Sequence, residues 1–171
     1  IVNVGTPGVE INQDYRPKAL SSEGKTAREI DAHGKYVLPG FIDTHAHIHS
    51  EASQQNVSAE YIFKLWMGHG ITSIREVFAS DGETRLLKLK AMSAENKITA
   101  PRITAFPFFS MPVDGEKTLP AITDAKSARE RVRHLKQIGA DGIKMMGARE
   151  DILWAAFEEA EKVGLDTTMH H

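Results

Sequence analysis

The chain has no cysteine among its 171 residues. This absence excludes disulfide bonds, thiolate zinc sites and cysteine nucleophiles, and it leaves His, Asp, Glu and Lys as the side chains available for chemistry. No apolar stretch approaches the roughly 20 residues that a membrane-spanning helix requires, and the start at Ile1 carries no signal-peptide pattern. We therefore expect no membrane partner, with the cytoplasm as the expected compartment.

An excess of positive charge is also absent, because 21 Lys and Arg residues stand against 23 Asp and Glu residues for a formal net charge of −2. The basic residues are dispersed and form no stripe that could neutralise phosphates. Nucleic acid is therefore not expected as a partner. A small-molecule or peptide substrate fits this surface better, and we expect a homo-oligomer.

Two regions of different composition divide the sequence. Residues 1–38 are rich in turn-forming residues, and their few apolar positions predict short strands, as in "AREIDAHGKYVLPG" (27–40). We interpret residues 1–38 as part of a small β domain. From Phe41 onward, short apolar runs alternate with amphipathic stretches, a pattern typical of βα units. Residues 39–171 are therefore predicted to form a second domain.

The second region predicts a regular order of strands and helices. Strands are expected at 41–48, 70–78, 102–109, 141–146 and 165–170. Helices are expected after Arg149 and after three residues suited to an N-cap, namely Ser58, Asp81 and Thr123. Gly70, Gly139 and Gly164 stand where glycines commonly end helices.

This alternation allows a doubly wound open sheet or a (β/α)₈ barrel of the TIM type. The first strand-to-helix connection has neither GxGxxG nor GxxxxGK[ST], so the phosphate-binding loop of many open sheets is missing. Polar side chains instead gather at the carboxyl ends of the predicted strands, where barrel active sites are built: His45, His47, Arg75, Glu76, Lys144, His170 and His171. The α/β class with a TIM-type barrel, of which about the first five strands are present, is the predicted fold.

The stretch "PGFIDTHAHIHS" (39–50) concentrates these polar residues. Side chains two apart on a strand share a face, so Asp43, His45, His47 and His49 would form one row. Neutral imidazole is a common ligand of divalent metals, and an HxH strand end brings two rings toward one point. An HxH pair alone also occurs as two chance surface histidines, so its surroundings must decide.

Three segments together resemble the metal-dependent amidohydrolase superfamily: "LPGFIDTHAHI" (38–48), "GADGIKMM" (139–146) and "LDTTMHH" (165–171). The resemblance implies a small β-sandwich domain leading into the barrel, with His45 and His47 as metal ligands. It also implies that Lys144 reacts with carbon dioxide to a carbamate that bridges two divalent ions, with zinc the expected metal. For Lys144 considered alone, a structural salt bridge at a strand end is the alternative.

The fifth predicted strand offers two adjacent histidines, which point to opposite faces of a strand. The resemblance places the metal ligand directly after the apolar strand, which selects His170 over His171. The expected metal ligands are therefore His45, His47, Lys144 and His170.

Other polar residues have less specific expectations. His49 is expected in a loop or beside substrate, and His33, His69 and His134 in solvated or capping roles. Asp43 either orients the ligands or serves the strand start. Arg75 either grips an anionic substrate group or forms a peripheral salt bridge.

The resemblance implies hydrolysis of an amide C–N bond in a dipeptide-like or cyclic amide substrate, by attack of a metal-bridging hydroxide. The family's strand-six histidine and its strand-eight aspartate, the general acid and base, are expected beyond residue 171, so no catalytic or substrate-binding residue is assigned. Three alternatives remain open. They are a mononuclear deaminase on the same fold, an esterase or lactonase, and a non-catalytic amidohydrolase-like scaffold.

Overall fold

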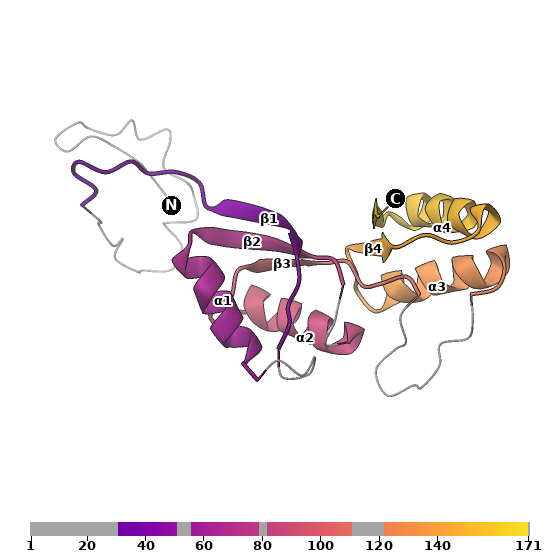
Figure 1. Ribbon diagram of the computed structural model, residues 1–171, viewed down its shortest axis with the longest axis horizontal. Helices are drawn as coiled ribbons and strands as arrows, with labels where there is room; N and C mark the ends of the chain where they lie inside the picture. Colours follow the sequence, from indigo (N-terminus) through magenta and orange to yellow (C-terminus); the bar gives the residue numbers. More distant parts are fainter. Residues whose placement is uncertain (1–30, 51–55, 79–81, 111–121, 171) are drawn as a thin grey trace, which may run out of the picture. The chain divides into compact units, whose positions relative to one another are not determined.

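The computed structural model describes residues 31–50, 56–78, 82–110 and 122–170 (Figure 1). Its contacts divide the chain between Leu38 and Pro39. Residues 31–40 hold a turn at His33 and Gly34 and no strand, so the strand predicted within 27–40 is wrong for this described part. The turn forms because Gly34 adopts a φ of 72°, which glycine tolerates. Most of the predicted β domain lies outside the described residues.

The second unit alternates strands and helices in chain order. The order is β1 (Phe41–Ala46), α1 (Ala59–Gly68), β2 (Ile71–Glu76), α2 (Glu83–Ala94), β3 (Arg102–Ala105), α3 (Ala125–Gln137), β4 (Gly142–Met145), α4 (Glu150–Val163) and β5 (Asp166–Met169). The strand pairs β1–β2, β2–β3 and β4–β5 are all parallel. The predicted α/β class and its alternation are confirmed. Each strand is shorter than predicted because the residues at its ends leave the sheet.

The strands neighbour one another in the order of the sequence. One sheet has the order β1-β2-β3 and the other contains β4 and β5. A parallel bridge between Phe108 and Lys144 joins the segment after β3 to β4. Backbone hydrogen bonds flank this bridge, from the Lys144 N–H to the Pro107 carbonyl at 3.0 Å and from the Phe109 N–H to the Lys144 carbonyl at 2.8 Å. The carboxyl ends of these strands therefore point the same way.

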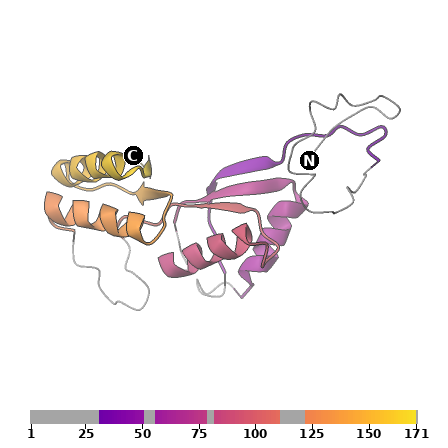
Figure 2. The ribbon, with the colours of Figure 1, turned by 180° about the vertical axis from the view of Figure 1, so that it is seen from behind.

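Helices α1 and α2 lie on one side of β1–β3 (Figure 2), and buried apolar clusters show which strand residues face the helices. Ile74 of β2 and Ile103 of β3 are buried with Phe63 of α1 and Leu86 of α2. In the second sheet, a similar cluster joins the β4 residues Ile143 and Met145 to α3 and α4. Because side chains alternate along a strand, Arg75 and Lys144 lie on the opposite face from these apolar neighbours.

The helix ends largely follow local signals. The Ser58 hydroxyl caps α1 by accepting a hydrogen bond from the Tyr61 N–H at 3.2 Å, as predicted. The prediction for α3 is wrong by one residue. Its N-cap is Asp124 and not Thr123, because Asp124 and Ser127 accept hydrogen bonds from each other's backbone N–H in a capping box.

The N-cap of α2 is Gly82, which offers no side-chain oxygen; Asp81 lies outside the described residues. Gly70, Gly139 and Gly164 follow three helices with positive φ angles of 82°, 96° and 65°, which confirms their predicted role. Within the described ranges, none of the helices has the length and apolar character that a membrane crossing requires.

Candidate metal centre

Three imidazoles follow one another at the carboxyl end of β1. His45 lies inside the strand, whereas His47 and His49 come after its last residue, Ala46. The ring centroids of His45 and His47 are 5.2 Å apart, and those of His47 and His49 are 5.7 Å apart. The structure therefore places these side chains in the row that their spacing predicts.

Asp43 belongs to the same row and fixes its backbone. Its Oδ1 accepts a hydrogen bond from the His45 N–H at 2.9 Å. The carboxylate thus contacts the main chain of His45 and not the imidazole. The contact supports the backbone of β1, and the two roles considered for Asp43 stay predictions.

His170 comes from the sheet formed by β4 and β5. It follows β5 directly, and its N–H donates to the carbonyl of Met145 at 3.1 Å. Its ring centroid lies 5.3 Å from that of His45. Residues 125 positions apart in the sequence are thus brought together at the carboxyl ends of β1 and β5. His171 lies outside the described residues, so the choice between these two histidines stays a prediction.

Lys144 is the buried cationic residue at this end of the strands. Its side chain lies on β4 with 2% of the residue exposed. Among the described residues, neither its Nζ nor the buried Nδ1 of His47 has a hydrogen-bond partner. The salt bridge considered for Lys144 therefore finds no carboxylate in the described part of the chain.

The environment lowers the pKa of three basic groups, those of Lys144, His45 and His47. Burial, and then the positive charge of Arg75, lower the pKa of Lys144. Loss of surrounding water lowers the pKa of His45, with further effects of Lys144 and His170. Burial also lowers the pKa of His47, followed by the effect of His45. The neutral imidazole, which is the form that binds metals, is therefore favoured.

A metal ion fits this donor set in chemistry, although the described residues do not complete its coordination. In the described ranges, no three His, Asp or Glu side chains converge on one point closely enough to bind a metal. Among the described residues, the buried Nδ1 of His47 and Nζ of Lys144 make no hydrogen bond, so both nitrogens are available as metal donors, and a bound ion is one way in which such buried polar atoms are satisfied. We name the set His45, His47, Lys144 and His170 the carboxyl-end cluster.

The remaining histidines lie elsewhere, and the Nε2 of His134 is buried without a hydrogen-bond partner in the described residues. The Nδ1 of His69 lies 2.7 Å from the Leu65 carbonyl at the end of α1. The Nε2 of His134 on α3 lies 3.6 Å from Glu83. With His33 in its turn, none of the three joins the carboxyl-end cluster, in agreement with their predicted minor roles.

Two aromatic residues beside the cluster, Phe78 and Phe108, were not predicted from the sequence. The ring of Phe78, after β2, meets His47 edge-on with centroids 5.7 Å apart. Phe108, after β3, meets Phe78 edge-on at 5.5 Å. Both end apolar runs of the sequence, but core residues do so as well, so no sequence signal separates them from the core.

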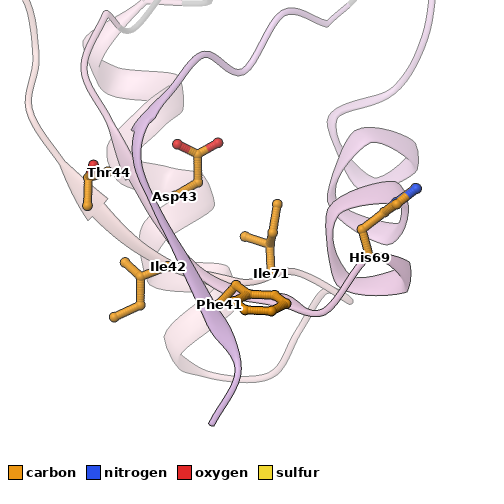
Figure 3. Close-up of a pocket in the computed structure, with 6 residues that line it drawn as sticks. All are labelled: Phe41, Ile42, Asp43, Thr44, His69 and Ile71. Carbon is orange, nitrogen blue, oxygen red and sulfur yellow. The ribbon is translucent and has the colours of Figure 1, made fainter. Parts of the chain in front are cut away.

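A shallow hollow lies at the opposite, amino-terminal part of β1 (Figure 3). It is lined by Phe41, Ile42, Asp43, Thr44, His69 and Ile71. Phe41 and Ile42 are largely exposed there, and the picture shows the His69 ring turned away from them. The hollow gathers no set of ligating side chains.

The chain combines parallel βα units with histidines at the carboxyl ends of two strands and a buried lysine on a third. Residues 36–171 match the amidohydrolase family, and the chain belongs to this family. The family resemblance drawn from the sequence is thereby confirmed.

Individual relatives match shorter stretches. The chain is 36% identical over 85 residues to an imidazolonepropionase of Caldanaerobacter subterraneus subsp. tengcongensis, covering 46% of this chain and 20% of that protein. It is 48% identical over 46 residues to adenine deaminase 2 of Desulfotalea psychrophila, covering 27% and 7%. The chain therefore spans a fifth or less of these curated relatives.

A solved structure also resembles the fold. It is a protein of Bifidobacterium longum provisionally assigned as a prolidase, with a TM-score of 0.59 and 24% identity. The match covers 77% of this chain and 35% of that one. At this identity the likeness supports the α/β fold and nothing about the substrate.

Proposed function

We propose that the protein is a metal-dependent hydrolase of amide C–N bonds, in which the carboxyl-end cluster binds two divalent ions, with zinc the expected metal. The observation that carries the proposal is the buried Lys144 amine, which has no partner in the described residues. Lys144 lies on a parallel strand whose carboxyl end points the same way as the ends that present His45 and His170. Family membership supports the hydrolase class. In this proposal β1–β5 belong to a (β/α)₈ barrel, and residues 1–38, which precede it, form part of a small β-sandwich domain.

Each residue of the cluster has a chemical task in this proposal. His45 and His47 offer neutral imidazole lone pairs from a single strand end. The neutral Lys144 amine attacks carbon dioxide, forms an N–C bond and releases one proton, which leaves an anionic carbamate with two oxygens. Metal ions bound there would activate a water molecule near neutral pH and polarise the scissile carbonyl. Asp43 holds the His45 backbone in place.

A dipeptide-like or cyclic amide is the proposed substrate, and the proton-transferring aspartate is proposed to come from residues other than these. The names of the relatives support C–N bond chemistry in general, since they include an imidazolonepropionase and an adenine deaminase. We keep a homo-oligomer as the proposed assembly.

A mononuclear deaminase is the second candidate, and the adenine deaminase relative favours it. That reaction would use His45, His47 and His170 without a bridging lysine. The burial of Lys144 without a partner argues against it, because an unused buried amine only costs desolvation energy. An esterase or lactonase would use the same cluster, whereas a non-catalytic scaffold would not require metal.

The test compares His47→Ala with His134→Ala in the natural protein. Zinc content measured by mass spectrometry, and turnover of dipeptide and cyclic amide substrates, should both be lost in His47→Ala. The His134→Ala control should retain both, because His134 lies on α3 outside the cluster. Stoichiometric zinc and normal turnover in His47→Ala would contradict the proposal, and a single ion in the wild type would favour the deaminase.

A further inference from the structure

We propose that Arg75 and Glu76, adjacent residues of β2, are positioning residues that fix the backbone on either side of His45 and His47. The inference rests on the proposed function, since its purpose is to hold imidazoles for metal binding. It rests on two side-chain contacts, one from each residue, to the main chain of residues 43–49, which we name the histidine segment.

The histidine segment needs such support because its pairing with β2 is irregular. The register of β1 and β2 shifts between Asp43 and Ala46, and it also shifts between Phe41 and Ile42. After β1 ends at Ala46, the strand pairing no longer defines where His47 lies. Side-chain contacts must therefore replace part of the regular hydrogen bonding there.

Arg75 acts before His45. Its Nε donates a hydrogen bond to the Thr44 carbonyl at 2.8 Å, which is the peptide group that leads into His45. Its guanidinium carbon lies 5.2 Å from the centroid of the Phe106 ring. Phe106 is buried and its ring packs closely against Gly142, where an added Cβ would lie 2.3 Å from it. The Arg75 side chain therefore rests on a fixed surface.

Glu76 acts after His47. It is fully buried, and its Oε2 accepts a hydrogen bond from the Ile48 N–H at 2.5 Å. Its Oε1 accepts from the Phe78 N–H at 3.0 Å. One carboxylate thus ties the peptide between His47 and His49 to the end of its own strand.

Adjacent residues on a strand point to opposite faces, so Arg75 and Glu76 reach the histidine segment from its two sides. Between their contact points, the Val77 N–H donates to the Ala46 carbonyl at 3.2 Å. Three hydrogen bonds from residues 75–77 therefore fix three successive points of the histidine segment. Neither side chain contacts substrate in this account; both act through His45 and His47.

The sequence left two roles open for Arg75, namely binding of an anionic substrate group and a peripheral salt bridge. Its contacts in the described residues are a carbonyl and an aromatic ring. We assign it instead to the support of β1.

The experiment measures zinc affinity by competition with a chromophoric chelator in Arg75→Met and Glu76→Gln of the natural protein. Arg75→Met removes the Nε–H, and Glu76→Gln leaves one carbonyl oxygen for two backbone N–H groups. Each change should weaken zinc binding about 10- to 100-fold, the usual effect of losing a group that orients a ligand.

Matched controls lie away from the cluster. Lys136→Met removes another bond from a cationic side chain to a carbonyl, that of Gly164, at 3.0 Å. Glu159→Gln alters a buried carboxylate that accepts from Arg133 at 2.6 Å. Both controls should bind zinc within about twofold of the wild type, because neither contacts the histidine segment.

A second measurement uses metal-free protein and the NMR signals of its histidine rings. The signals of His45 and His47 should shift or broaden in Arg75→Met and Glu76→Gln, whereas those of His69 and His134 should not. If Arg75→Met does not fold, Glu76→Gln carries the test. Unchanged His45 and His47 signals with wild-type zinc affinity would overturn the inference, as would equal losses in the controls. A wild type without zinc would refute the proposed function, and the metal-free signals would then decide the inference alone.

Discussion

Two buried basic residues, Arg131 and Lys144, differ in how the chain satisfies them. Arg131 on α3 is 6% exposed and donates to both carboxylate oxygens of Glu83, at 3.3 and 2.7 Å. It also donates to the carbonyls of Phe108 and Phe109. Lys144 on β4 is 2% exposed, and its Nζ finds no partner in the described residues. The described residues satisfy the first side chain, and the proposed carbamate bridge offers an explanation for the second.

The contrast follows from the cost of burying charge. The effective penalty for burying an ion is several kcal/mol, and a partner must offset it. Arg131 has such a partner in Glu83. For Lys144 the environment lowers the pKa through burial and the charge of Arg75, so the neutral amine is favoured. A neutral amine is the form that reacts with carbon dioxide, which connects this electrostatic difference to the proposed bridge.

The largest expected effect is on catalysis at Lys144. Lys144→Arg should lose the pair of metals and lower turnover more than about 100-fold, because a guanidinium stays cationic and cannot become a carbamate. Lys144→Ala should behave in the same way, and added small carboxylates should restore part of its activity by occupying the bridging position. Metal content and steady-state kinetics measure both effects. Full activity of Lys144→Arg would show that Lys144 has no role in catalysis and would contradict its contrast with Arg131.

The next largest effect is on stability, where substitution of Arg131 should have a larger effect than substitution of Lys144. Arg131→Met should cost about 3–5 kcal/mol in the free energy of unfolding, because it leaves the Glu83 carboxylate buried without its partner. Lys144→Met should leave the metal-free protein unchanged or make it more stable, since it removes an unpartnered polar group. Urea unfolding of metal-free protein measures both values. Equal losses would show that the chain satisfies Lys144 after all.

A smaller effect is expected at Gly142, two residues before Lys144 on β4. A Cβ there would lie 2.3 Å from the Phe106 ring and 2.6 Å from the Asp166 carbonyl oxygen. Gly142→Ala should therefore cost about 1–3 kcal/mol by overpacking. Gly68→Ala in α1 is the control, since nothing lies within 4 Å of its Cβ position, and it should stabilise by up to about 1 kcal/mol. Thermal unfolding of the two variants should therefore move in opposite directions.

The smallest effect is a pH dependence from His45 and His47. Both have a pKa below the ordinary value of 6.5, so folding favours their neutral forms. Their contribution to stability is therefore complete above about pH 6.5 and is lost as the pH falls through the lowered pKa values. The metal-free His45→Gln/His47→Gln double variant should lose less stability over this range than the wild type. An identical pH profile in urea unfolding would contradict the assignment.

The sequence predicted what depends on local patterns. Apolar runs and turn residues predicted the βα order, and Ser58 and Gly164 marked helix ends correctly. The N-cap of α3 is Asp124 and not the predicted Thr123, because Asp124 forms a reciprocal capping box with Ser127. The strand expected within 27–40 is absent from residues 31–40, where the apolar residues Tyr36 and Leu38 remain exposed.

The sequence named candidate ligands for the site but not the contacts that support them. The HxH spacing and the family resemblance named His45 and His47, and the structure brings His170 beside them. The contacts of Arg75 with Thr44 and of Glu76 with Ile48 join residues about 30 positions apart. No local pattern specifies them, because they depend on the register of β1 against β2.

A crystal structure of the metal-loaded natural protein tests the central claim most directly. The account predicts that electron density at the Lys144 amine extends by a planar three-atom group, within bonding distance of two metal ions held by His45, His47 and His170. An unmodified Lys144 amine far from any metal would contradict the account and favour a mononuclear site.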